Sequence, residues 1–175
     1  MRMPPEIPGV LSAAQVRQTA DHIASWQLDS GMIPWFPGGH ADPWNHIEAA
    51  MALVIGDRRA EAEAAYQWLV DIQRPDGSWH QYYLDDGVEQ DKLDANVIAY
   101  IAAGAWHHYL HFRDLGYLEE MWKVVEPAID FVLALSAATR RDSLGPAPRW
   151  HPVVVRPAHR LVIDRPQPAL CGRHR

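Results

Sequence analysis

Cysteine is almost absent from this sequence, and so are long apolar runs. The chain has 175 residues and one cysteine, Cys171, which excludes an internal disulfide and a zinc site built on paired cysteines. The first 15 residues hold no apolar segment of the kind that leads a secreted protein, and the apolar run around residues 97–106 is too short to cross a bilayer. We therefore expect a cytoplasmic protein without stable membrane insertion.

Positive charge is scarce in most of the chain. Residues 1–135 hold 8 Lys and Arg against 20 Asp and Glu, whereas residues 136–175 hold 8 Arg and only two acidic residues. Proteins that bind nucleic acid need cationic side chains to displace the counterions of the phosphates. The acidic part of the chain therefore argues against a nucleic acid partner. Because 48% of all residues are hydrophobic, disorder of the whole chain is excluded as well.

Helical spacing of apolar residues extends from residue 12 to residue 135 and predicts an all-α fold with five helices. Ser12 followed by Gln15 forms a capping box for a first helix that ends near residue 27. Asp42 before Pro43 predicts the start of the second helix, and Gly56 its end.

The other three helices are expected to begin at Asp57, at Asp91 and near residues 115–118. Pro127 lies inside the fifth helix. We expect it to bend this helix without ending it, because the apolar spacing resumes at Ile129.

The two long loops, residues 28–41 and 74–90, share a pattern. A glutamine and a glycine stand four residues apart, after an apolar residue and before a tryptophan and an aspartate. The two copies are Ile23, Gln27, Gly31, Trp35 and Asp42, and Leu69, Gln73, Gly77, Trp79 and Asp91. The glutamine can bond helix-end carbonyls or loop backbone, the glycine permits a left-handed turn, and the tryptophan can fill the gap between neighbouring helical hairpins. The pattern predicts stacked hairpin repeats; the alternative is two unrelated loops that share residues by chance.

This pattern resembles known toroidal proteins. Residues 69–79 resemble the glutamine–tryptophan repeat of squalene and hopene cyclases and of protein prenyltransferase β-subunits. Residues 94–106 with 116–131 are similar to six-hairpin (α/α) glycosidases. Both resemblances imply part of an (α/α)6-type toroid over residues 12–135, about two and a half hairpins, with the inner helices starting around a central cleft.

The resemblances imply two kinds of activity. The first is that of a prenyltransferase-like or terpene-cyclase-like parent family acting on an isoprenoid or lipid-linked substrate; the alternatives are a glycoside hydrolase-like enzyme acting on a glycan and a non-catalytic helical-repeat module. The zinc ligands of prenyltransferases include a cysteine, which residues 1–135 lack, and Asp85 with Asp86 does not match the acidic motif of the cyclases. We expect no cofactor and no metal.

Candidate catalytic residues lie where the inner helices begin. Asp94, Glu48 and His46 are the candidates, because a carboxylate beside a second acid or an imidazole can act as general acid or base. For Asp94 a purely structural role in a capping box is an equal alternative. Trp35, Trp44, Asn96 and Tyr82 are predicted to bind the substrate. His107 and His111 have metal-ligand spacing, but a solvated pair is the favoured interpretation.

Residues 136–175 lack the helical pattern and predict an irregular, basic, disordered tail. Back-translation with GC-rich codons allows residues 136–145 to be reread in another frame as a third Gln-x3-Gly before a tryptophan. We therefore interpret the tail as the product of a frameshift and this copy as truncated and inactive. An open toroid edge would leave apolar surface uncovered, which predicts self-association.

Overall fold

The computed structural model describes residues 4–142, and within them it contains six helices and one two-stranded sheet. The helices are α1 (Ala13–Ala24), α2 (Pro43–Ile55), α3 (Arg59–Ile72), α4 (Ala95–Ala99), α5 (Ile101–Phe112) and α6 (Leu115–Asp142), and the strands are β1 (Tyr82–Leu84) and β2 (Gly87–Gln90). The prediction of a mostly helical chain is confirmed. Within this range no helix has the length and apolar character that a bilayer span requires.

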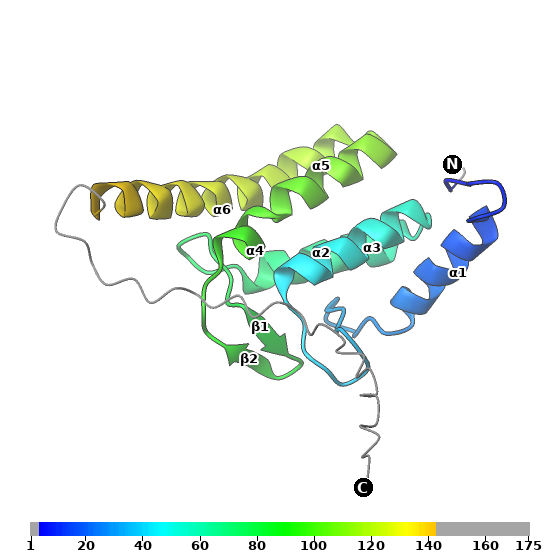
Figure 1. Ribbon diagram of the computed structural model, residues 1–175, viewed down its shortest axis with the longest axis horizontal. Helices are drawn as coiled ribbons and strands as arrows, with labels where there is room; N and C mark the ends of the chain where they lie inside the picture. The colour runs from blue at the N-terminus through cyan, green and yellow to red at the C-terminus, as the bar shows by residue number, and fades with distance from the viewer. Residues whose placement is uncertain (1–3, 143–175) are drawn as a thin grey trace, which may run out of the picture.

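The helices pack as adjacent hairpins around α2. This helix contacts α1, α3, α4 and α5, and α6 packs against α4 and α5. Figure 1 shows the pair α5 and α6 beside the pair α2 and α3, with α1 on the opposite side. The largest fully buried side chains include Trp79, Tyr66 and Leu69, so the core lies between α3 and its neighbours.

Two helix starts follow the predicted local chemistry. Ser12 accepts a hydrogen bond from the backbone of Gln15, whose side chain accepts one from the backbone of Ser12, and both bonds of the capping box form. Asp42 caps α2, with Pro43 in its first turn and Gly56 at its end. Pro127 lies inside α6, which continues past it.

Other boundaries differ from the prediction. Asp57 does not cap α3: its φ is 63°, and the cap residue, Arg58, makes no side-chain capping bond. Asp91 does not cap the fourth helix either, since Asp94 does so three residues later. The fourth helix itself is divided at Tyr100 into α4 and α5.

Two further elements lie outside the predicted pattern. The antiparallel pair β1–β2 occupies a segment that we predicted as loop. Helix α6 runs to Asp142, seven residues beyond the end predicted at residue 135. The rest of the predicted tail, residues 143–175, lies outside the described residues.

The two glutamine–glycine loops dock on the next helix hairpin in the same way. Gln27 Nε2 donates to the carbonyl of Gly31 in its own loop and to that of Glu61 in α3, both at 2.9 Å. Gln73 Nε2 donates to the carbonyls of Gly77 at 3.1 Å and of Val124 in α6 at 2.9 Å. The repeat predicted from the sequence is therefore present as equivalent hydrogen bonds.

The tryptophans of the two repeats differ in their surroundings. Trp79 is 1% exposed and donates its indole N–H to the carbonyl of Leu69 at 2.8 Å, so it fills the gap as predicted. Trp35 is 45% exposed and does not. In the first loop the position two residues after the glycine is held by buried Ile33. Trp35 and Trp79 are therefore not equivalent, and their alignment was wrong.

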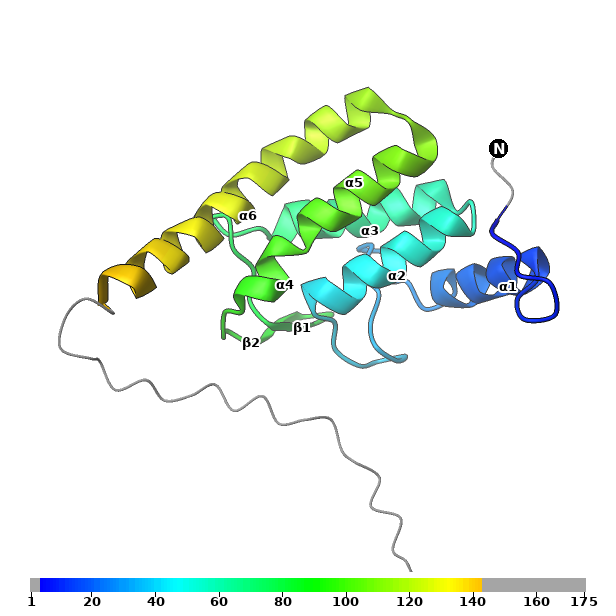
Figure 2. The ribbon, with the colours of Figure 1, turned by 45° about the horizontal axis from the view of Figure 1, so that its top comes forward.

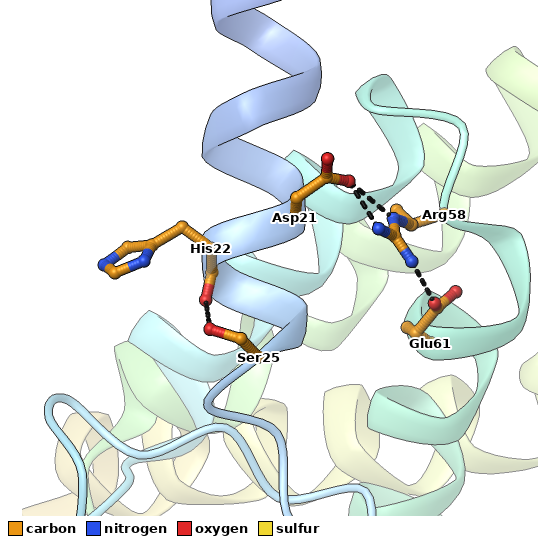
Figure 3. Close-up of polar contacts among 5 residues, drawn as sticks. All are labelled: Asp21, His22, Ser25, Arg58 and Glu61. Atoms are coloured by element: carbon orange, nitrogen blue, oxygen red, sulfur yellow. Dashed lines mark hydrogen bonds and ion pairs between the residues drawn. The ribbon is translucent and has the colours of Figure 1, made fainter.

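An ion-pair cluster holds α1 to the turn between α2 and α3. Arg58 donates through Nε to Asp21 of α1 at 2.9 Å and through Nη1 to Glu61 of α3 at 2.8 Å. Figure 3 shows the guanidinium between the two carboxylates, with His22 pointing away from it. The hydrogen bond to Asp21 is the largest cause of the raised pKa of Arg58. This cluster complements the Gln27 contact, since both connect the end of the first repeat to α3.

Candidate functional site

The N-terminal end of α2 lies against the β-hairpin. Ala41 and Tyr83 exchange two backbone hydrogen bonds of 2.9 Å, which join the segment before α2 to β1. Tyr83 is buried with its ring edge against Trp68, at a centroid distance of 5.5 Å. Figure 2 shows the hairpin beside the ends of α2 and α4. Residues from three separate chain segments therefore meet at this end of the helices.

Asp42 organises this end of α2. Its Oδ1 accepts the backbone N–H of Asn45 at 3.0 Å, and its Oδ2 accepts the indole N–H of Trp35 and the side-chain amide of Asn45, both at 2.7 Å. A buried carboxylate at a helix N-terminus is favoured by the helix dipole. Both oxygens are occupied by donors within the chain, so Asp42 acts as a cap and as the anchor of Trp35.

Two cavities share part of their lining at this end of α2. The smaller, of about 250 Å³, is lined by Trp35, Asp42, Trp44, Asn45, Gln81, Tyr82 and Val97. The larger, of about 390 Å³, is lined by Ile23, Trp26, Ile33, Pro34, Trp35, Asn45 and Ala49. Trp35 and Asn45 belong to both linings. We call the two cavities together the aromatic groove. Three of the predicted substrate-binding residues, Trp35, Trp44 and Tyr82, line its smaller cavity.

His40 and Glu89 support two of these aromatic rings. The ring of His40 stacks on Tyr82 at 4.6 Å and meets Trp35 edge-on at 4.6 Å. Its Nδ1 lies 2.9 Å from Oε2 of Glu89, which comes from β2. Sequence reasoning missed both residues, because His40 and Glu89 lie 49 residues apart in the chain.

Glu48 lies in an aromatic cluster between α2 and the start of α5. Its Oε1 accepts the indole N–H of Trp44 at 3.0 Å and the hydroxyl of Tyr100 at 3.2 Å. The rings of Trp44 and Tyr100 stack at 4.6 Å with an angle of 12° between their planes. Burial and the bond to Glu48 raise the pKa of Tyr100, so its phenol stays a donor. Glu48 itself is exposed, and it is not in the lining of the aromatic groove, although Trp44, to which it is bonded, is.

His46 does not face the groove. It is 1% exposed; its Nδ1 accepts the N–H of Ile33 at 3.1 Å, and its Nε2 lies 2.8 Å from the carbonyl of Ala65, to which it donates. Burial lowers the pKa of His46 to about 4. Both ring nitrogens are committed to backbone, so the structure gives this predicted catalytic residue a structural role.

Asp94 and Asn96 lie at the start of α4. Oδ1 of Asp94 accepts the backbone N–H of Asn96 at 2.9 Å, which is a capping bond. Neither residue is in the lining of the aromatic groove, although Val97 of the same helix is. The structure therefore brings Trp35, Trp44 and Tyr82 together and places Asp94 and Asn96 beyond them.

The histidines of α5 do not assemble a metal cluster. In the part of the chain that the structure describes, no group of three or more His, Cys, Asp or Glu side chains is placed to hold an ion. Burial, and then the neighbouring His111, lowers the pKa of His107. His107 lines a separate apolar cavity between α1 and α2.

Comparison with known proteins shows a similarity to a glycosidase. No protein-family model matches the sequence. Over 129 residues the chain is 50% identical to a Mycolicibacterium hassiacum protein named MMP endo-(1,4)-3-O-methyl-alpha-D-mannosidase. The aligned part is 74% of this chain and 36% of that protein, so the chain spans about a third of the curated relative it matches. This similarity agrees with the resemblance to glycosidases and not with the resemblance to prenyltransferases and cyclases.

Proposed function

We propose that this chain is a glycosidase-type helical protein whose aromatic groove binds a glycan of 1,4-linked α-mannose units. The 50% identity to a named endo-mannosidase carries the proposal. The substrate class is taken from the name of that protein. The isoprenoid alternative has no comparable support.

The composition of the groove supports a sugar ligand. Pyranose rings have apolar C–H faces that pack on aromatic side chains, and their hydroxyl groups need a few well-placed polar partners. The smaller cavity offers Trp35, Trp44 and Tyr82 as faces, with Asn45 and Gln81 as polar groups. The bond from Trp35 to Asp42 and the stack of His40 on Tyr82 hold two of these rings before a ligand arrives.

Glycoside hydrolysis generally requires two carboxyl groups. We propose Glu48 as the acid–base residue and Asp94 as the second carboxylate. Glu48 is exposed beside Trp44, and its two internal bonds both use Oε1, which leaves Oε2 for a glycosidic oxygen or water. Asp94 likewise uses Oδ1 for its cap.

The experiment combines binding and cleavage. Calorimetric titration with 1,4-linked 3-O-methyl-α-D-manno-oligosaccharides is expected to show binding that Trp35→Ala weakens. Release of reducing ends is then compared for wild type, Glu48→Gln and Asp94→Asn, which keep the hydrogen-bond geometry of each side chain and remove its acid–base function. We expect each variant to lower the rate at least about 100-fold.

Glu119→Gln is the matched control, since Glu119 is an exposed carboxylate on α6 away from the groove. A folded chain that binds no α-mannoside would contradict the proposal. Equal rates for wild type and Glu48→Gln would remove Glu48 from the mechanism. The sequence analysis predicted that this copy is inactive. Cleavage by wild type that is lost in Glu48→Gln would contradict that prediction.

A further inference from the structure

The two cavities of the aromatic groove differ in chemistry. The smaller is lined by Asp42, Asn45 and Gln81 in addition to its aromatic rings. The larger is lined by aliphatic and aromatic side chains and by a single polar one, that of Asn45. An apolar cavity of about 390 Å³ therefore opens directly beside a polar one.

The walls of the larger cavity are held in place by contacts within the chain. Its loop residues follow Gly31, whose carbonyl is bonded by Gln27 at 2.9 Å, and the backbone N–H of Ile33 is bonded to buried His46. Asn45 and Ala49 lie one turn apart on α2. The cavity is therefore built before a ligand arrives.

Few hydrogen-bond partners remain for a ligand in this cavity. The indole N–H of Trp35 is given to Asp42, so Trp35 presents carbon surface. The amide nitrogen of Asn45 also donates to Asp42. A sugar hydroxyl placed here would exchange its hydrogen bonds to water for few side-chain partners, the amide of Asn45 and the indole N–H of Trp26, which costs binding energy. A methyl ether has no donor to lose and gains from the transfer of its methyl group out of water.

We propose that the larger cavity is a subsite for the O-methyl group of a methylated sugar, with Ala49 and Ile23 in its wall as specificity-determining residues. The inference rests on the proposed function and adds which part of the groove distinguishes methylated from plain glycans. Burial of one methyl group contributes about fourfold in affinity. The hydroxyl of a plain glycan, which exchanges water for fewer partners in this cavity, widens that difference.

The test compares two ligands of equal length by calorimetric titration of the full chain. These are a 1,4-linked α-D-manno-oligosaccharide with 3-O-methyl groups and the same oligosaccharide without them. We expect wild type to prefer the methylated ligand by at least about fourfold. Ala49→Leu places a branched side chain in the cavity, so we expect it to lower the affinity for the methylated ligand until the preference is lost.

Ala52→Leu is the matched control. Ala52 is half-buried on the same helix and lines a different cavity, together with Met51 and Ile55. It should keep the preference. If circular dichroism shows that Ala49→Leu does not fold, Ile23→Thr serves instead, because it removes the ethyl branch of Ile23 and places a hydroxyl in the same wall; we expect a smaller preference.

Equal binding of both ligands by wild type, or a preference for the plain ligand, would overturn this inference and leave the proposed function standing. Binding of neither ligand by a folded chain would overturn both. A preference that survives in Ala49→Leu and in Ile23→Thr would place the recognition of the methyl group elsewhere and also overturn the inference.

Discussion

Gln73 reaches across from the end of α3 to Val124 of α6, where its side-chain amide meets the backbone carbonyl at 2.9 Å. Gln27 makes the same bond to Glu61 of α3. The loop glycine of each repeat packs on the same neighbouring helix as the glutamine does. Gly31 lies against the carbonyl of Ala64, three residues after Glu61, and Gly77 lies against that of Pro127, three residues after Val124. One glutamine and one glycine therefore fix how each hairpin meets the next.

Replacement of Gln73 by alanine is expected to destabilise the fold. The carbonyls of Gly77 and Val124 would lose a partly buried donor, and an unsatisfied polar group costs about 1–3 kcal/mol. Urea unfolding measures the difference. Gln67→Ala is the control, because Gln67 on the same helix bonds only exposed Asp71, and we expect it to cost less than about 0.5 kcal/mol. Equal losses would show that the Gln73 contact is not special.

The glycine of the same loop gives an independent prediction. Gly77 has φ of +84°, and a Cβ there would lie 2.3 Å from the carbonyl oxygen of Pro127. Gly38 has a similar φ of +75° with nothing within 4 Å of a Cβ. Gly38→Ala should therefore lower the free energy of unfolding by about 1 kcal/mol, because only the left-handed backbone is strained. Gly77→Ala should lower it by about 3 kcal/mol, because the Cβ also overlaps Pro127. Thermal unfolding of both variants separates the two terms; similar melting temperatures would contradict the close contact.

Buried His46 predicts a loss of stability as the pH falls. Its pKa is about 4 in the fold against 6.5 in the unfolded chain, because burial disfavours the cation. The unfolded chain therefore binds a proton below pH 6.5 that the folded chain does not. The contribution of His46 to the free energy of unfolding is therefore fully present above pH 6.5 and is lost as the pH falls towards 4. The loss between pH 7.5 and 5 is about 2 kcal/mol.

Urea unfolding at several pH values tests this dependence. His46→Gln is expected to be less stable at pH 7.5 and to lose about 2 kcal/mol less than wild type on acidification. Buried His108, whose pKa is also lowered mainly by burial, contributes in the same direction and leaves a residual slope. The control is Gln67→Ala, which removes no titratable group from α3 and should leave the slope unchanged. An unchanged slope in His46→Gln would contradict the prediction.

Helix starts that are set by residues close together in the chain were predicted correctly. The capping box of Ser12 and the Asp42–Pro43 start were correct, because a cap is a hydrogen bond between residues three apart in the chain. Asp91 and Asp94 both precede an apolar helix pattern. The choice between them depends on where β2 ends, and β1 in turn pairs with Ala41, about forty residues earlier. Such pairing leaves no local signal.

The candidate site was predictable in its residue types more than in its contacts. Aromatic residues in the predicted loops and at the start of the second helix indicated Trp35, Tyr82 and Trp44, and they line one cavity. The burial of His46 was not predictable, because its two partners, Ile33 and Ala65, come from other elements. The different surroundings of Trp35 and Trp79 had a signal, since Ile33 and Trp79 both stand two residues after a repeat glycine.

Exposed apolar side chains on α5 and α6 predict self-association. Trp106 of α5 is 53% exposed, and Trp122 and Leu133 of α6 are 56% and 58% exposed. On each helix these side chains lie beside the buried stripe, where the repeat would place a further helix. A second copy that covers them removes this surface from water, which favours a dimer.

Sedimentation equilibrium over a range of concentrations measures this association. We expect a rise in average mass with concentration for wild type, and a dissociation constant at least about tenfold higher for Trp122→Glu, because burial of one large apolar side chain contributes more than 1.4 kcal/mol. Val10→Glu is the control, since Val10 is exposed before α1 and away from this surface. A wild-type chain that stays monomeric at every concentration would contradict the prediction, because the indoles of Trp106 and Trp122 would then remain exposed to water.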